Sequence, residues 1–244
     1  YIFENGGDFC LGGELIGVDR PHHHDFLADR LDPIQVRQFF EDNNWDKVVA
    51  FQTRNPMHRA HKEIMQRAAE EIGGKAFLHP VVGMTKQGDV DYFTRVRCYQ
   101  KIIKKFPENS TLLGLLPLSM RMAGPREALW HAIIRKNYGC THFIIGRDHA
   151  GPGNDKDGNP FYGPYDAQEL VKSFESELDI RMIMFKMVGY HKIQEKYVSL
   201  DDPNIEMKDI MFISGTQLRE KLNLGENIPD WFTYSDITEE LRKT

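Results

Sequence analysis

Lys47 to His61 read KVVAFQTRNPMHRAH, and this stretch indicates the fold of the chain. Its first five residues, KVVAF, are a short apolar run that predicts a buried strand. Asn55 suits the cap of a helix and Pro56 its first position, so we expect a helix from Pro56 to Ile72. A strand that runs directly into a helix is the first half of a βαβ unit, which is typical of a parallel sheet.

The alternation of strand and helix continues on both sides of this stretch. Asp32-Pro33 predicts the start of a helix that ends near Asn43. Further strands are expected at 76–82, 111–118, 141–145 and 180–185, and further helices at 93–106, 125–137 and 166–177. Strands that alternate with helices of ten or more residues indicate an α/β fold, a doubly wound, mostly parallel sheet with helices on both faces.

Ligands of such folds bind beyond the carboxyl ends of the strands. We therefore expect the chemistry of this chain in the loops that follow Phe51, Val82, Leu118 and Ile145.

Residues 1–30 differ from the rest of the chain. Five glycines are spread among short apolar pieces, and Pro21 and the run His22–His24 follow. We interpret residues 1–30 as the tail of a β-rich N-terminal domain with a linker, and residues 31–244 as a second, larger domain. The histidine run is either a metal site or a solvated loop, and we favour the loop.

Composition restricts the partners and the compartment. The net charge of −5 argues against a broad nucleic-acid surface, and no apolar run approaches the ~20 residues that span a membrane. Cys10, Cys98 and Cys140 form no CxxC pair, which favours buried free thiols in a reducing compartment. We expect a cytoplasmic protein. An organelle stays open, because the chain does not begin with Met and shows no targeting segment.

A phosphate-binding site is predicted at residues 52–61. A helix that starts at the strand end presents free N–H groups and a positive dipole to an anion. Arg54 can hold an oxyanion with two hydrogen bonds, and His58 and His61, three residues apart, can donate to phosphate oxygens. The two histidines could instead ligate a metal, but no third ligand is spaced nearby. Neither GxxxxGK[ST] nor GxGxxG is present, so this is neither a P-loop nor a dinucleotide-binding turn.

A second loop with site character follows the strand THFII. It reads GRDHAGPG over residues 146–153, and its three glycines let the backbone approach a ligand closely. Arg147 and His149 supply positive charge or hydrogen-bond donors there. A loop rich in Gly and Asp can also be a plain solvated connection, but its place after a sheet strand favours a site.

At these two motifs the sequence resembles the sulfate adenylyltransferase, or ATP sulfurylase, family. That family carries QxRNPxHxxH followed by GRDHAGxG, and both motifs stand here as QTRNPMHRAH and GRDHAGPG. MRMAGPREALWHAIIRKNYGCTHFIIG, FYGPYDAQEL and FISGTQLRE also resemble it, so the likeness runs from about Asp32 to the C-terminus. The resemblance implies the fold of the HxxH nucleotidylyltransferases and makes residues 31–244 a catalytic domain.

The resemblance also implies the roles of individual residues. It makes Thr53, Arg54 and Asn55 catalytic. It assigns sulfate to Gln52, Arg54 and the backbone of Ala150. It assigns ATP to Gln52, Thr53, Arg54, Asn55, His58, His61, Gly146, Arg147, Asp148, His149 and Val188. No residue is assigned to a metal, because Mg²⁺ is expected to arrive bound to ATP.

The implied reaction is direct attack of sulfate on the α-phosphorus of ATP, with release of pyrophosphate, the first step of sulfate activation. ATP, sulfate and pyrophosphate are the expected partners, together with further copies of the chain in a homo-oligomer. Two alternatives stay open. One is another HxxH adenylyltransferase with a different acceptor, and the other is a non-catalytic ATP-binding regulatory module.

Overall fold

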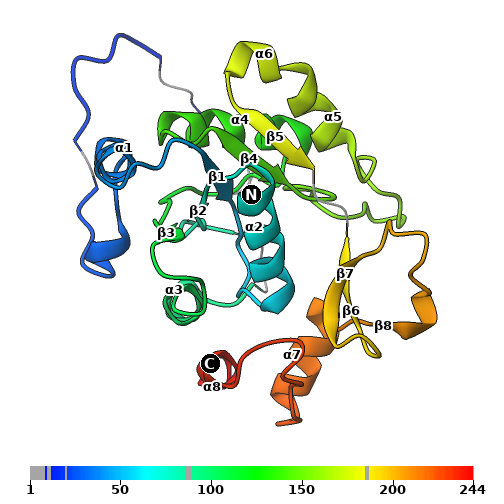
Figure 1. Ribbon diagram of the computed structural model, residues 1–244. Coiled ribbons are helices and arrows are strands. Elements are labelled where there is room, and N and C mark those ends of the chain that lie inside the picture. Colours follow the sequence, from blue (N-terminus) through cyan, green and yellow to red (C-terminus); the bar gives the residue numbers. More distant parts are fainter. Residues whose placement is uncertain (1–8, 10–11, 20, 86–88, 185–186, 244) are drawn as a thin grey trace.

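The structure, a computed structural model, describes residues 9, 12–19, 21–85, 89–184 and 187–243. Cys10 and Phe185, which belong to predictions made above, lie outside these residues. Five parallel strands form the main sheet in the order β3-β2-β1-β4-β5 (Figure 1). Their bounds are β1 Val48–Phe51, β2 Lys75–Leu78, β3 Thr111–Leu113, β4 His142–Ile145 and β5 Arg181–Met184.

Helices cover both faces of this sheet, as the alternating pattern predicted. One apolar core joins the sheet to α1, α4 and α5, and a second joins its other face to α2, α3 and α8. Val48 and Ala50 belong to the first core and Val49 to the second, because successive strand residues point to opposite faces. The helices are α1 Pro33–Asp42, α2 Arg59–Glu71, α3 Tyr92–Ile103, α4 Pro125–Asn137, α5 Asp166–Ser173, α6 Glu175–Leu178, α7 Gly215–Asn223 and α8 Ser235–Leu241.

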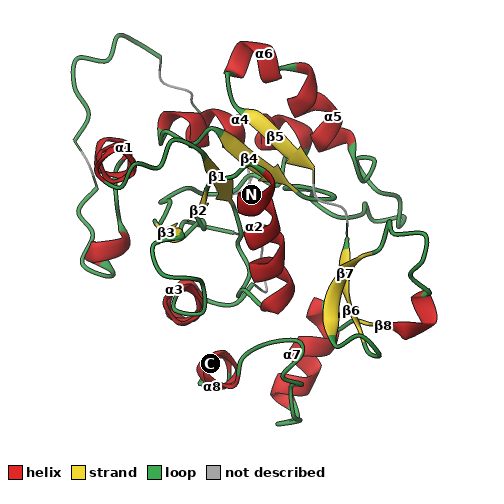
Figure 2. Cartoon of the chain, viewed as in Figure 1, coloured by secondary structure: helices red, strands yellow, loops and turns green. Residues whose placement is uncertain are grey.

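A small antiparallel sheet follows the main one and was not anticipated. It consists of β6 Val188–His191, β7 Lys196–Ser199 and β8 Ile210–Met211, in the order β7-β6-β8, and η2 Met207–Asp209 precedes β8 (Figure 2). Arg67 of α2 donates from Nη2 to the carbonyl oxygen of Tyr197 at 2.6 Å, and Tyr190 stacks on Trp231. These contacts hold the small sheet against the main domain.

The expected start of α2 is wrong. Asn55 was predicted to cap this helix, but α2 begins at Arg59 and His58 is its N-cap residue. The carbonyl of a cap residue must accept the first helical hydrogen bond. The carbonyl oxygen of Asn55 instead accepts from the hydroxyl of Tyr99 at 2.9 Å and lies 3.1 Å from the hydroxyl of Thr53. Residues 52–58 are therefore a loop and not the first turn of a helix.

Other expected elements differ only in their ends. The expected strands at 76–82 and 111–118 are shorter, and beyond them only Val81 and Leu116 still form a parallel bridge. The expected helix at 166–177 is divided at Phe174 into α5 and α6. Asp32 caps α1 as predicted, and its carboxylate accepts the N–H of Gln35 at 2.9 Å.

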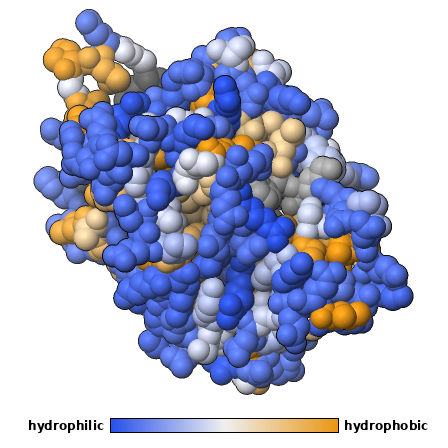
Figure 3. Space-filling model, in the orientation of Figure 1, coloured by the Kyte–Doolittle hydropathy of each residue, from blue (hydrophilic) through white to orange (hydrophobic). Residues whose placement is uncertain are grey.

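The N-terminal segment carries little regular structure where it is described. Among its described residues up to Arg30 there is no strand, and η1 Leu27–Asp29 is the regular element found there. Leu15, Ile16 and Val18 are strongly exposed, and an apolar patch marks this segment at the upper left of the mostly hydrophilic face in Figure 3. The boundary near residue 30 stays a prediction.

Two features bear on the compartment. Cys98 and Cys140 are buried free thiols, as expected. None of the helices in the described part of the chain has the length and hydrophobicity that a bilayer crossing requires.

Candidate active site

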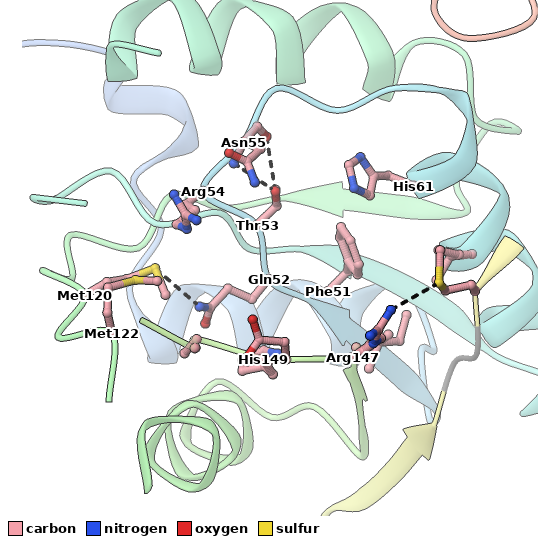
Figure 4. Close-up of a pocket in the computed structure, with 17 residues that line it drawn as sticks. Phe51, Gln52, Thr53, Arg54, Asn55, His61, Met120, Met122, Arg147 and His149 are labelled. Carbon is pink, nitrogen blue, oxygen red and sulfur yellow. Dashed lines mark hydrogen bonds between the residues drawn. The ribbon is translucent and has the colours of Figure 1, made fainter. Parts of the chain in front are cut away.

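The strand order creates a switch point between β1 and β4, where sheets of this kind bind their ligands. The chain runs from β1 outward to β2 and β3, and later returns to the other side of β1 with β4 and β5. The loops that leave β1 and β4 separate at this point and open a crevice at the carboxyl ends of the strands. A cavity of ≈ 360 Å³ lies there, lined by residues 51–55 of one loop and 146–151 of the other (Figure 4).

The first wall is the loop after β1, and hydrogen bonds fix its backbone. Thr53 is buried, and its Oγ1 accepts the N–H of Asn55 at 3.1 Å. From α3, the buried Arg95 donates to the carbonyl oxygen of Arg54 at 3.0 Å, and Tyr99 donates to that of Asn55. The carbonyls of this loop are thus held from behind, which leaves the side chains of Thr53 and Arg54 on the cavity side (Figure 4).

Arg54 is partly neutralised within the protein. Its Nη1 forms an ion pair with the carboxylate of Asp89, in the loop after Val82. Among the described residues, Nη2 and Nε of Arg54 find no acceptor. They are the donors that this guanidinium can offer to an oxyanion in the cavity.

The two histidines of the HxxH motif occupy different environments. His61 lines the cavity, and its Nδ1 accepts the backbone N–H of His58 at 3.4 Å, so its proton lies on Nε2. Burial lowers the pKa of His61 to about 4, so it offers a neutral donor rather than a charge. His58 does not line the cavity. Its ring lies between those of His61 and Phe232, with centroids 3.9 and 4.5 Å away, and its buried Nδ1 has no hydrogen-bond partner in the described part of the chain.

The second wall is the loop after β4, which has a tightly folded backbone. Asp148 and Ala150 are in the left-handed region, with φ of 49° and 56°. A Cβ on Gly151 would lie 1.8 Å from Asp148 Oδ1, so a larger residue at this position would displace the Asp148 side chain. The carbonyl of Ala150 accepts the N–H of Gly124 at 3.0 Å. Its own N–H finds no acceptor among the described residues and remains available to an anion.

The other predicted residues divide into two groups. Gly146, Arg147, Asp148 and His149 all line the cavity, and the Arg147 guanidinium lies 3.7 Å from Met187 Sδ. Val188 is the first residue of β6 and does not line the cavity, whereas its neighbour Met187 does. No cluster of three or more His, Cys, Asp or Glu side chains suited to a metal occurs in the part of the chain that the structure describes.

Sequence reasoning missed several residues of the site. Apolar side chains complete the lining, namely those of Phe51, Ile64, Met120, Met122, Ile144 and Met187. Glu127 and His131 lie behind the cavity, and the signal for them was a Glu and a His four residues apart on one helix. Nothing in the sequence distinguishes the methionines from core residues.

A doubly wound parallel sheet with a cavity at its switch point is typical of the class of nucleotide-binding α/β proteins. A sequence model of the ATP-sulfurylase family matches residues 28–244, and the chain belongs to that family.

Curated relatives agree over the whole chain. It is 55% identical over 243 residues to a sulfate adenylyltransferase of Eremothecium gossypii, covering 48% of that protein. It is 52% identical over 244 residues to the sulfate adenylyltransferase of Saccharomyces cerevisiae, again covering 48% of it. The chain thus spans about half the length of the curated relatives it matches.

A solved structure shares the fold. The chain superimposes on one described as a hexameric APS kinase from Thiobacillus denitrificans, with a TM-score of 0.74 and 27% sequence identity. The alignment covers 91% of this chain and 41% of the other.

Proposed function

We propose that this chain carries the site at which ATP and sulfate form adenosine 5′-phosphosulfate and pyrophosphate. One observation carries the proposal. Arg54 and Gln52 on one wall, and the unoccupied N–H of Ala150 on the other, border a single cavity at the switch point of the sheet. A tetrahedral oxyanion needs donors from several directions, and this arrangement supplies them. The proposal makes residues 31–244 the catalytic domain.

Sulfate is assigned to Gln52, Arg54 and Ala150. The guanidinium supplies charge and two free donor nitrogens, while the amide of Gln52 and the N–H of Ala150 supply neutral donors. Asp89 holds Arg54 from behind and limits the side chain to one orientation. A site of this kind selects by size and oxygen geometry, so other tetrahedral oxyanions should enter it.

ATP is assigned to the remaining length of the cavity. Its phosphates would lie along residues 52–55, within reach of the His61 Nε2–H, and its nucleoside along residues 146–149, toward Val188. His58 supports His61 by a tilted ring contact, with centroids 3.9 Å apart, and acts on ATP through it.

The reaction needs no covalent intermediate with the protein. A sulfate oxygen attacks the α-phosphorus, the new O–P bond forms, and the bond to the pyrophosphate oxygen breaks on the opposite side. Negative charge grows on the phosphoryl oxygens and the leaving group, and catalysis consists of positioning two anions and neutralising that charge. Arg54 neutralises charge between the two substrates, and Thr53 and Asn55 donate hydrogen bonds. His61 donates to the departing pyrophosphate.

The described residues fit a metal that arrives with its substrate. Asp89 is engaged by Arg54, and no acidic cluster borders the cavity among the described residues. Mg²⁺ bound to the phosphates of ATP would neutralise part of their charge.

The deciding experiment is sulfate-dependent release of pyrophosphate from ATP by the purified chain. Selenate or molybdate in place of sulfate should also drive release. Binding of ATP without any release of pyrophosphate would instead identify a regulatory nucleotide-binding module.

Assembly and location are part of the same proposal. We expect a homo-oligomer, which sedimentation of the purified chain would test. We also expect a cytoplasmic location, in keeping with the buried free thiols of Cys98 and Cys140.

A further inference from the structure

A chain of buried polar side chains runs behind the second wall of the cavity. Glu127 and His131 are 2% and 0% exposed and lie one turn apart on α4. Glu127 Oε1 is 3.5 Å from His131 Nε2, and His131 Nδ1 is 3.0 Å from His149 Nε2. His149 in turn lines the cavity. This series of contacts therefore connects the buried carboxylate of Glu127 to His149, a residue that can touch a ligand.

Glu127 also holds the loop that carries Met120 and Met122. Its two carboxylate oxygens accept the N–H groups of Arg121 at 2.7 Å and Ala123 at 2.9 Å. Burial alone would raise the pKa of Glu127, but the neighbouring His131 and these two hydrogen bonds keep it below its usual value, so the group is an anion at neutral pH. One carboxylate thus fixes a cavity loop and faces a histidine.

His131 and His149 are both neutral. Burial lowers the pKa of His131 to about 4 and that of His149 well below its ordinary value. Arg135 adds to both effects. Its fully buried guanidinium donates to the carbonyl oxygens of His79 and His131 at 2.9 and 3.4 Å. Each imidazole therefore carries one proton, and the 3.0 Å contact between the rings holds one of the two.

Two arrangements of these protons are possible in principle, and Glu127 decides between them. With its proton on Nε2, His131 turns an N–H toward the carboxylate of Glu127, 3.5 Å away, and accepts from His149 at Nδ1. With its proton on Nδ1, it presents a lone pair to the carboxylate, which is unfavourable. The amide of Gln52, whose Nε2 is 3.5 Å from His131 Nε2, favours this second arrangement. Gln52 is neutral and Glu127 is an anion at the same distance, so the attraction between the carboxylate and the Nε2 proton is the stronger effect.

We propose that Glu127 and His131 are positioning residues that fix His149 as the Nε2–H tautomer and leave its Nδ1 as a hydrogen-bond acceptor for the ligand. The oxygens of sulfate and of the phosphates of ATP are essentially unprotonated at pH 7.5 and cannot satisfy this acceptor. A hydroxyl or amino group of a nucleoside can. The inference rests on the proposed function for the identity of that nucleoside. It assigns His149 to the nucleoside part of ATP and not to its phosphates.

Nitrogen NMR of the histidine-labelled full chain tests the tautomers without any assay of activity. We expect His131 and His149 both to show a protonated Nε2 and an unprotonated Nδ1 at pH 7.5. Addition of adenosine or ATP should shift the Nδ1 signal of His149, whereas pyrophosphate alone or sulfate alone should leave it in place. A proton on Nδ1 of His149, or a shift with pyrophosphate but not with adenosine, would overturn the proposal.

Variants separate positioning from mere stability. Glu127→Gln removes the charge and one of the two backbone hydrogen bonds, so His131 should shift toward the Nδ1–H form and the KM for ATP should rise about tenfold. The KM for sulfate should stay within about twofold. Glu169→Gln removes an exposed carboxylate of α5 and is the matched control, with no change expected.

The outcomes also separate the two proposals. If the protein binds adenosine but never releases pyrophosphate, the proposed function fails, while the tautomer result stands alone. If Glu127→Gln does not fold, the tautomers of the unaltered protein still decide. Unchanged tautomers and an unchanged KM for ATP in a folded Glu127→Gln variant would refute the role of Glu127.

Discussion

Arg54 is the residue whose charge the proposed reaction depends on most. Arg54→Ala should lower the turnover with sulfate by about 10³-fold, because a group that stabilises developing charge contributes several kcal/mol. Arg54→Lys should lower turnover by at least about tenfold, because an ammonium cannot make the planar two-point contact of a guanidinium with an oxyanion. Steady-state rates of pyrophosphate release measure both. Arg126→Ala, at an exposed arginine, is the control. Near-normal turnover of the Lys variant would contradict the assigned role.

Ala150 tests the second wall, and its backbone alters the design of the test. Because its φ is 56°, Ala150→Val would add strain as well as bulk. Ala150→Leu should raise the KM for sulfate by about tenfold or more through bulk beside the free N–H, and Ala150→Gly should be mild. Asn tolerates this conformation and is close to Leu in size, so Ala150→Asn separates bulk from strain. A sulfate KM unchanged in both the Leu and Asn variants would remove this loop from the sulfate site.

At the scale of elements, the start of α2 distinguishes the two histidines of the HxxH motif. His61→Asn keeps an acceptor for the N–H of His58 but loses the Nε2–H donor. It should therefore slow the exchange of pyrophosphate into ATP by about tenfold with unchanged helix content. His58→Asn keeps a good cap residue and loses ring stacking, so a smaller effect on exchange is expected. Equal losses in both variants, measured by isotope exchange, would show that His58 contacts the phosphates directly.

The same element shows where prediction from local pattern stops. The Asn-Pro pair is a good helix start by local preference, yet α2 begins three residues after Pro56. The hydroxyl of Tyr99 in α3 donates to the carbonyl oxygen of Asn55. The two residues are 44 positions apart, so no local sequence pattern predicts this hydrogen bond. By contrast α4 has the predicted bounds, Pro125 to Asn137, because Pro and the following residues decide its start locally.

At the scale of the whole molecule, buried neutral histidines should make the protein sensitive to mild acid. The folded-state pKa values of His61 and His131, about 4, lie below the unfolded value of 6.5. Unfolding therefore takes up protons below pH 6.5, and the free energy of unfolding should fall by several kcal/mol as pH falls from about 6.5 to 4. Above pH 6.5 this contribution is fully present. Urea unfolding at a series of pH values measures it.

His79 provides the control for that prediction. It is fully buried, and neither ring nitrogen has a hydrogen-bond partner among the residues that the structure describes. Burial, with Arg135 as a smaller cause, lowers its pKa well below the usual value. His79→Leu should therefore reduce proton uptake on unfolding near pH 5 by about one. An unchanged pH dependence in this variant would mean that the buried histidines do not cause the acid sensitivity.

The sequence by itself determined the fold class, the approximate positions of helices α1 to α5 and the two loops that border the cavity. These features depend on local periodicity, on turn chemistry and on motifs within ten residues, all of which are visible along the chain. It also identified the candidate residues 52–55 and 146–150, because parallel strands put their carboxyl ends at one edge of a sheet.

Only the tertiary structure decided which loops meet and what surrounds them. The order β3-β2-β1-β4-β5 brings residue 52 beside residue 149, and strand order depends on which apolar faces pack together across the whole chain. Three pairings likewise depend on long-range packing or on burial: Arg54 with Asp89, Asn55 with Tyr99, and His131 with Glu127. Burial, and not residue type, makes these histidines neutral, and burial is a property of the folded molecule.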